Sequence, residues 1–121
     1  LPLLGARSRR AAKASVAARA QGAYQTFHDR LMGTPIVPND AYLRSIAEDA
    51  GIDADRLLRD MASETVSDTL ARTARIADAF GFYGTPALVI GRTAVLGNVT
   101  RHQLRRLIAA ERSAPAPHPC D

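Results

Sequence analysis

The segment Tyr83-Gly84-Thr85-Pro86-Ala87, followed by Leu88-Val89-Ile90, is the part of this sequence best suited to present backbone groups to a ligand. Proline has no amide hydrogen, so within a sheet it is confined to the first residue of a strand, an edge or a bulge. X-Pro bonds are the ones for which a cis peptide costs little, and we predict that the Thr85-Pro86 bond is cis. A strand entered through such a proline leaves the preceding carbonyl and amide unpaired and free to face a ligand. Thr85 and Pro86 are therefore the candidate site residues.

A thiol is the other chemically distinctive group, and the sequence has only one, Cys120, which follows Pro119 near the C-terminus. Thiol–disulfide exchange needs an attacking thiolate, a leaving thiolate and a neighbouring resolving thiol. Cys120 has no partner cysteine, so the chain alone is not expected to be a competent oxidoreductase. His118 and Cys120 together fall short of the four ligands of a structural zinc site. We therefore predict no catalytic residue, no metal and no cofactor within this chain.

The other polar residues of interest have structural interpretations. A general base needs a nucleophile or a substrate proton within hydrogen-bond reach, and the sequence offers His28 no obvious partner. We interpret His28 as a partly exposed helical histidine. Asp53 and Asp55 are interpreted as helix-start residues, because negative charge complements the positive end of a helix dipole. The hydroxyl residues Ser8, Ser63 and Thr100 are interpreted as helix caps.

The composition indicates one globular domain with a thin, mainly helical core. The chain has 121 residues, of which 46% are apolar. Much of the apolar content is alanine, which favours helices and buries little area per residue. No apolar stretch approaches the roughly 18 residues of a membrane-spanning helix, so no membrane span is predicted.

The net charge of +4 is carried almost wholly by arginine, in two clusters within predicted helices. Each of these helices has apolar residues on its other side, and no aromatic residue is interleaved with the charges. We therefore interpret both clusters as solvated helix faces and predict no nucleic-acid partner. The clustered residues are Arg7, Arg9, Arg10 and Lys13, and Arg101, Arg105 and Arg106. A non-enzymatic helical binding module that uses these faces remains an alternative.

Capping residues and hydrophobic periodicity predict four consecutive helices before the proline loop. They span about residues 8–31, 39–50, 53–61 and 63–80, and Gly51 and Gly81 are expected to end the second and fourth. The side chains expected to face inward are Val16, Ala20, Ala23, Phe27 and Leu31, then Leu43, Ile46, Ala47 and Ala50, then Leu57, Leu58 and Met61, and finally Val66, Leu70, Thr73, Ala77 and Phe80.

After Pro86 the pattern changes from helical to extended. Residues 87–90 and 93–96 are predicted strands separated by Gly91-Arg92, and glycine in the first loop position fits a type II′ hairpin turn. Thr100 and Gln103 form a capping-box pattern that opens a last helix, with Leu104, Leu107 and Ile108 expected to face inward. The proline-rich residues 113–121 are predicted to be a disordered tail.

Two short strands do not make a stable sheet, because an isolated hairpin is marginal in water. The strand count therefore predicts a mixed sheet whose first strands lie before residue 1. Leu1-Pro2-Leu3-Leu4 is too short to be a whole strand and is interpreted as the end of another one. An exposed sheet edge would also permit self-association of the chain.

Several segments, in this order, resemble the DsbA-like thiol–disulfide oxidoreductase family over about residues 1–112. Leu1-Pro2-Leu3-Leu4-Gly5 is similar to the segment that leaves the first β-α-β unit in that family. Residues 21–24 and 27–32 are similar to its first inserted helix. Residues 81–86 and 89–91 resemble its cis-proline loop and following strand, and Gly97 with the final helix completes the pattern.

This resemblance implies an incomplete thioredoxin-like α/β fold, with a helical insertion at residues 8–81 and a hairpin and final helix at residues 82–112. It also implies that Thr85 and Pro86 bind an extended segment of substrate polypeptide, and that the parent protein acts in the periplasm or cell envelope. Family members carry a Cys-x-x-Cys that this sequence lacks. The chain is therefore expected to be a C-terminal fragment that is inactive alone.

A second family with this architecture is a competing interpretation. Glutathione-dependent isomerases and kappa-type glutathione transferases also insert helices into a thioredoxin fold, and their proline loop binds glutathione instead of a protein. The short helical insertion and the Gly84-Thr85-Pro86 sequence favour the oxidoreductase.

Overall fold

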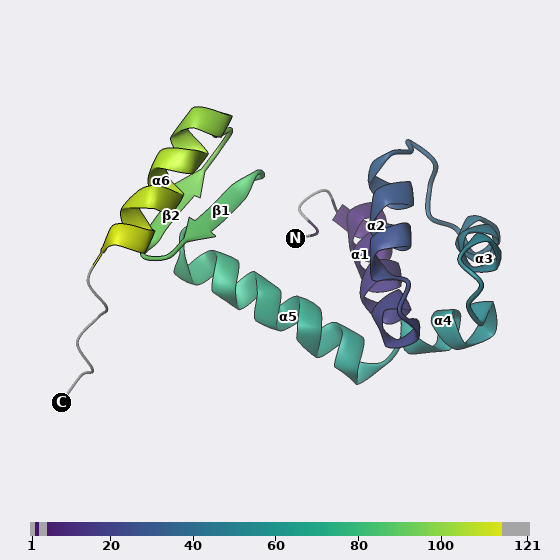
Figure 1. Ribbon diagram of the computed structural model, residues 1–121. Coiled ribbons are helices and arrows are strands. Elements are labelled where there is room, and N and C mark those ends of the chain that lie inside the picture. The colour runs from purple at the N-terminus through teal and green to yellow at the C-terminus, as the bar shows by residue number, and fades with distance from the viewer. Residues whose placement is uncertain (1, 3–4, 115–121) are drawn as a thin grey trace. The chain divides into compact units, whose positions relative to one another are not determined.

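The computed structural model describes residues 2 and 5–114 of the chain. These residues divide into two compact units, a helical unit up to Ile76 and a hairpin unit from Ala77 onward. The elements are α1 (Gly5–Ala18), the 3-10 turn η1 (Arg19–Gln21), α2 (Tyr24–Met32), α3 (Asp40–Asp49), α4 (Ala54–Asp60), α5 (Glu64–Ala79), β1 (Ala87–Ile90), β2 (Thr93–Leu96) and α6 (Arg101–Ser113) (Figure 1). Helices precede a two-stranded antiparallel sheet and a last helix, which confirms the predicted α/β class.

The predicted first helix, residues 8–31, is wrong as a single element, because the chain breaks at Gly22. Gly22 has a φ of 76°, and its amide donates to the Arg19 carbonyl, which ends η1. The next helix starts at Tyr24, so five α-helices precede the hairpin instead of four. Ala20, expected to face inward, is exposed as a result. The apolar steps of four and three continue across Gly22, so periodicity alone could not reveal the break.

The core of the first unit is built largely from alanine. Its largest fully buried side chains are Phe27, Leu43, Ile46 and Leu57. The other members of the buried cluster are Ala14, Ala17, Ala18, Ala23, Ala47, Met61 and Val66. Small side chains let the helices approach closely but remove little apolar area from water. The expected thin helical core is confirmed in this unit.

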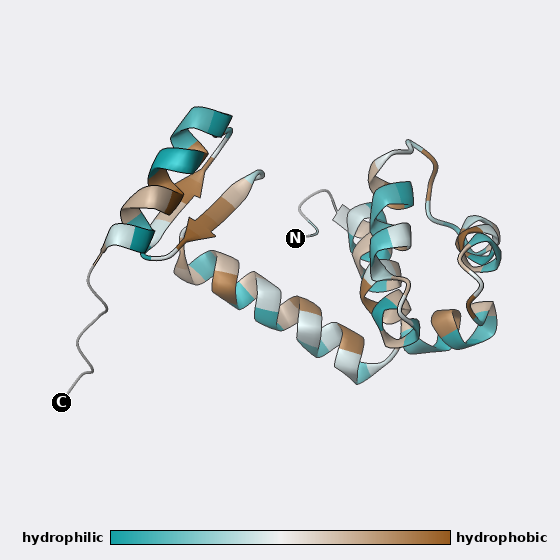
Figure 2. Cartoon of the chain, in the orientation of Figure 1, coloured by the Kyte–Doolittle hydropathy of each residue, from teal (hydrophilic) through white to brown (hydrophobic). Residues whose placement is uncertain are grey.

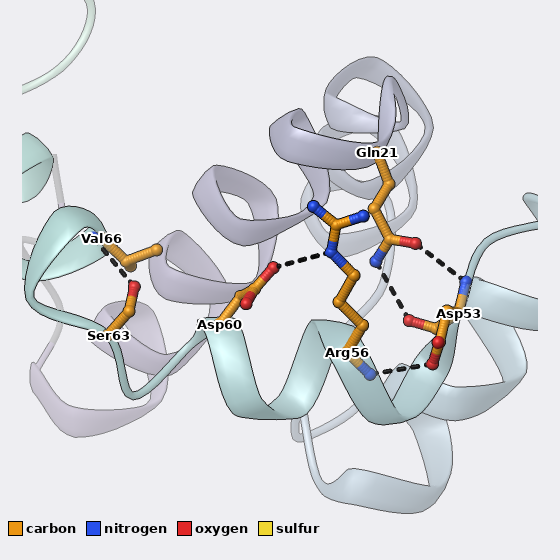
Figure 3. Close-up of polar contacts among 6 residues, drawn as sticks. All are labelled: Gln21, Asp53, Arg56, Asp60, Ser63 and Val66. Atoms are coloured by element: carbon orange, nitrogen blue, oxygen red, sulfur yellow. Dashed lines mark hydrogen bonds and ion pairs between the residues drawn. The ribbon is translucent and has the colours of Figure 1, made fainter.

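Gln21 joins the turn after α1 to the start of α4, across 32 residues of sequence. Its side-chain Nε2 donates to the Asp53 carbonyl at 3.0 Å, and its Oε1 accepts from the Asp53 amide at 3.0 Å (Figure 3). The Asp53 carboxylate accepts from the Arg56 amide at 2.8 Å, which caps α4. This backbone hydrogen bond lowers the pKa of Asp53 below its ordinary value. One amide side chain thus satisfies both backbone groups of a helix-capping residue.

Replacing Gln21 with alanine is expected to lower the free energy of unfolding of the first unit by about 1 to 2 kcal/mol, because two hydrogen bonds are lost. Urea unfolding followed by circular dichroism measures the change. Gln25→Ala is the matched control, since the Gln25 amide donates to Asp29 on the same helix at 2.8 Å and so bridges no two elements. That variant is expected to change stability by about 0.3 kcal/mol. Equal effects of the two substitutions would contradict the bridging role of Gln21.

Helix ends in the first unit follow the predicted capping residues, with one exception. Asn39 accepts from the Tyr42 amide at 2.9 Å and caps α3, and Ser63 accepts from the Val66 amide at 3.3 Å at the start of α5 (Figure 3). Gly51 has a φ of 66° and follows the last turn of α3, as predicted. Ser8 is not a cap: it lies inside α1, which already begins at Gly5.

In the second unit, β1 and β2 have the predicted bounds. Ala87 pairs with Leu96, and Ile90 pairs with Thr93 across the two-residue loop. Gly91 in that loop has a φ of 56°, while no non-glycine residue described has a positive φ. This combination fits the predicted type II′ turn, which needs positive φ only at its first central residue.

The strands of this hairpin are largely apolar, as their colouring shows (Figure 2). Leu88 and Val95 lie on one face, and the pair of Val89 and Ala94 lies on the other. Strands that are buried on both faces have such continuous apolar runs, whereas strands with one solvated face alternate. The sequence of the hairpin is therefore that of strands within a covered sheet.

The final helix, α6, covers one of these faces. Val95 shares a cavity with Leu107 and Ala110 of α6, and Thr93 Oγ1 lies 3.5 Å from Glu111 Oε1. Thr100 caps α6 in a capping box with Gln103, as predicted. Of the side chains expected to face inward, Leu104 and Leu107 are half-buried, but Ile108 is exposed. The face with Val89, which is 47% exposed, has no such cover among the described residues.

The stripe expected along α5 is buried only in part. Val66 and Ala77 are buried and Leu70 is half-buried, but Thr73 is exposed and Phe80, just past the helix, is 47% exposed. The predicted strand end at Leu1-Pro2-Leu3-Leu4 lies outside the described residues except for Pro2. His118, Cys120 and the predicted tail from residue 115 onward also lie outside them. Within the described part of the chain, no helix is long and apolar enough to cross a membrane.

Candidate functional site

The Thr85-Pro86 loop connects the end of α5 to the start of β1. The helix ends at Gly81, which has a φ of 66°. The Phe82 amide donates to the Ala77 carbonyl at 2.8 Å and the Gly81 amide donates to the Asp78 carbonyl at 2.9 Å. These two hydrogen bonds form a Schellman motif, in which a left-handed glycine satisfies the last helical carbonyls. The predicted end of the fourth helix at Gly81 is confirmed, and the chain turns from there toward Thr85.

The peptide bond between Thr85 and Pro86 is cis, as the sequence predicted. The Pro86 carbonyl accepts from the Gly97 amide at 2.8 Å, which extends the hairpin by one hydrogen bond beyond Ala87 and Leu96. Pro86 therefore lies directly before β1, where its lack of an amide hydrogen removes no hydrogen bond between the two strands.

Thr85 has backbone groups without a partner in the part of the chain that the structure describes. Within residues 2 and 5–114, no backbone hydrogen bond involves Thr85, and its side chain is exposed. An N–H and a C=O side by side at the end of a strand can pair with an extended chain, as in β-strand addition. The geometry thus offers one donor and one acceptor next to the exposed ring of Pro86.

Aromatic residues precede this loop. Phe80 was predicted to face inward, whereas Phe82 and Tyr83 were given no role of their own. The Tyr83 side chain is 86% exposed, the largest exposure among the exposed large hydrophobic residues. The rings of Phe80 and Phe82 stack with their centroids 5.6 Å apart. An exposed tyrosine supplies a large, rigid contact surface at low entropic cost. The signal in the sequence was a bulky aromatic residue directly before the Gly84-Thr85 turn.

The other polar residues singled out in the sequence do not gather at this loop. His28 is half-buried on α2 and stacks on Tyr24, with ring centroids 5.8 Å apart, which confirms the expected helical histidine. Asp55 forms an ion pair with Arg44 at 2.7 Å, and Asp53 caps α4. Among residues 2 and 5–114, no group of three or more His, Cys, Asp or Glu side chains could hold a metal ion.

Comparison with known proteins agrees with this architecture. The family model described as "DSBA-like thioredoxin domain" matches residues 2–109. A solved structure, "The crystal structure of a thioredoxin-like oxidoreductase from Silicibacter pomeroyi DSS-3", is similar with a TM-score of 0.81 and 38% sequence identity. The similarity covers 93% of this chain but only 65% of that protein. No curated protein matches the chain.

The family match covers the helices α1 to α5, both strands of the hairpin and most of α6. These elements follow one another in the order that the resemblance implied. The thioredoxin-like fold of the DsbA type is therefore confirmed. The chain belongs to the DSBA-like thioredoxin domain family.

Proposed function

We propose that this chain is the C-terminal part of a DsbA-like protein thiol–disulfide oxidoreductase, and that it supplies the substrate-binding loop but not the redox cysteines. The observation that carries the proposal is the uncovered apolar face of the hairpin, with Val89 and Ala94 exposed, in a chain that spans 65% of a related oxidoreductase. Further strands, with a helix bearing Cys-x-x-Cys, would cover this face and complete the sheet.

The chemistry of the complete protein would be exchange of a disulfide between its cysteine pair and a substrate protein. One thiolate attacks a disulfide sulfur, a mixed disulfide forms as the other sulfur leaves, and the second cysteine resolves it. The described residues contribute no thiol to these steps, since the one cysteine of the sequence is Cys120. By family resemblance, the reaction would take place in the periplasm or cell envelope.

The chain alone is therefore expected to show no turnover in an insulin-reduction assay beyond that of a simple thiol at the same concentration. Addition of a β-α-β unit bearing Cys-x-x-Cys, taken from a DsbA-like protein, is expected to restore turnover. The same unit with both cysteines replaced by serine is the control. Turnover by the chain alone would contradict the proposal, as would a failure of the two parts to bind one another.

We further propose that Thr85 binds extended substrate polypeptide through its backbone. Its N–H and C=O are unpaired within the described residues, and Pro86 beside it is exposed. A substrate strand that pairs with these two groups would lie along the start of β1, and Tyr83 would supply apolar contact next to it.

A pair of substitutions separates the backbone of Thr85 from its side chain. Thr85→Pro removes the N–H and is expected to weaken binding of a reduced, unfolded polypeptide about 2- to 10-fold, the effect of one hydrogen bond. Thr85→Ala keeps the N–H and is expected to bind as the wild type does. Fluorescence anisotropy with carboxymethylated lactalbumin measures both affinities. If Thr85→Ala lost as much affinity as Thr85→Pro, recognition through the backbone would be excluded.

A further inference from the structure

A surface cavity of about 750 Å³ lies in the helical unit, and all of its lining residues belong to that unit. It is bounded by α1, by the start of α3 and by the last turn of α4 with the residues after it. The lining residues are Ala6, Arg9, Arg10, Lys13, Asp40, Leu58, Met61 and Ala62. Its volume falls within the range of about 300 to 1,000 Å³ that is typical of small-molecule sites.

One of the three cationic side chains in this cavity is already neutralised. The Nε of Arg10 donates to the Pro38 carbonyl at 2.6 Å, and its guanidinium forms an ion pair with the Asp40 carboxylate. These contacts fix Arg10 against the segment that leads into α3. They also use Asp40, the one carboxylate among the described residues that line the cavity. Arg10 and Asp40 therefore form a part of the cavity lining that carries no net charge.

Arg9 and Lys13 are the uncompensated charges of the cavity. Among the residues that the structure describes, no carboxylate lies within ion-pair distance of either side chain. They are four residues apart on α1, and like charges at this spacing destabilise a helix. An anion held between Arg9 and Lys13 would relieve the repulsion between them.

The opposite side of the cavity is apolar. Met61 is 6% exposed and Leu58 is half-buried, and both line the cavity together with Ala62 and Ala6. A purely ionic ligand such as phosphate would leave this surface in contact with water. A ligand with one charged end and an apolar body would contact both parts of the cavity.

We propose that this cavity binds an amphipathic anion, with a carboxylate or phosphate head at Arg9 and Lys13 and an aliphatic chain on Leu58 and Met61. The head group receives charge-assisted hydrogen bonds from the two cations, and the chain removes apolar area from water. The proposal goes beyond the redox function and does not depend on it, because no thiol and no part of the hairpin takes part.

Titration of the full chain with decanoate, below its micelle concentration, tests the proposal by two-dimensional NMR of backbone amides and arginine Nε–H groups. Shifts are expected at Arg9, Lys13 and Met61. Decyl phosphate is expected to bind at the same place, whereas decanol, decylamine and acetate are expected to bind at least about tenfold more weakly. If decanol or decylamine bound as tightly as decanoate, the proposed need for a negative head group would be wrong. If acetate bound as tightly as decanoate, the proposed need for an aliphatic chain would be wrong.

Substitutions locate the site. Arg9→Gln combined with Lys13→Gln is expected to weaken decanoate binding about tenfold or more. The matched control, Arg7→Gln with Arg75→Gln, removes the same charge from exposed residues that do not line the cavity. Ala62→Trp, at an exposed rim position, is expected to block the chain while leaving the fold intact. Circular dichroism checks that each variant is folded. If the double charge variant and Ala62→Trp both bound decanoate as tightly as the wild type, the proposal would be overturned.

Discussion

Phe27→Ala is expected to lower the free energy of unfolding of the helical unit by about 3 to 5 kcal/mol. The Phe27 side chain is fully buried and is the largest member of a core in which five neighbours are alanines: Ala14, Ala17, Ala18, Ala23 and Ala47. Alanine side chains have no rotamers with which to fill a void, so the cavity left by the ring cannot collapse easily. A small domain is stable by only about 5 to 15 kcal/mol, so the loss is a large share of the total.

Urea unfolding followed by circular dichroism at 222 nm measures this effect. Phe80→Ala is the matched control, because it removes the same ring from a side chain that is 47% exposed. That control is expected to cost less than about 1 kcal/mol. If Phe27→Ala were no more harmful than Phe80→Ala, the buried cluster around Phe27 would not be the core of the helical unit.

Gly91→Ala is expected to destabilise the hairpin unit by about 1 to 3 kcal/mol, for two separable reasons. Gly91 has a φ of 56°, which an L-residue adopts at a cost. A Cβ at this position would also overlap the side chain of Glu111 on α6. Glu111 would have to move away from Arg92, whose Nε lies 3.7 Å from its carboxylate, and from Thr93.

A double-mutant cycle separates the two contributions. In a Glu111→Ala background the overlap is absent, so Gly91→Ala should then cost only the backbone term of about 1 kcal/mol. Hydrogen exchange of the β1 and β2 amides, measured by NMR, reports the local stability of the hairpin. Identical effects of Gly91→Ala in both backgrounds would show that the contact between Gly91 and Glu111 has no energetic role.

The hairpin could be predicted to the residue because its signals are local. Its strands are short apolar runs, a glycine occupies the loop position that needs positive φ, and Pro86 marks the entry. The capping box at Thr100 and the ends at Gly51 and Gly81 were equally local. Each depends on residues within about four positions of one another, which sequence patterns report well.

The helical unit was predicted less well where long-range contacts decide the outcome. Gly22 interrupts a periodic pattern that fits a helix on both sides, and the following helix is positioned by packing of Phe27. The hydrogen bonds between Gln21 and Asp53 join residues 32 positions apart, and no local signal marks them. Burial of α5 was overestimated because an amphipathic stripe shows that a helix can be covered, not that it is.

In the candidate sites, too, local features could be predicted from the sequence and long-range contacts could not. The position of Thr85 and Pro86 before a strand followed from the chemistry of proline, and the structure shows their backbone and exposure in detail. The basic cluster at the start of α1 was interpreted as a solvated face. The structure leaves Arg7, Arg9 and Arg10 exposed, in agreement with that interpretation. It also places Arg9 and Lys13 on the wall of a surface cavity with Leu58 of α4, and this pairing of α1 with α4 could not be inferred from charge patterning.

The abundance of alanine in the buried cluster has a thermodynamic consequence. The heat-capacity change of unfolding is set mainly by the apolar area newly exposed to water, and each alanine contributes little of it. Five alanines among the buried cluster therefore imply a small heat-capacity increment for the helical unit. The curve of its unfolding free energy against temperature should therefore have little curvature, and differential scanning calorimetry would record a small difference in heat capacity between the folded and unfolded states.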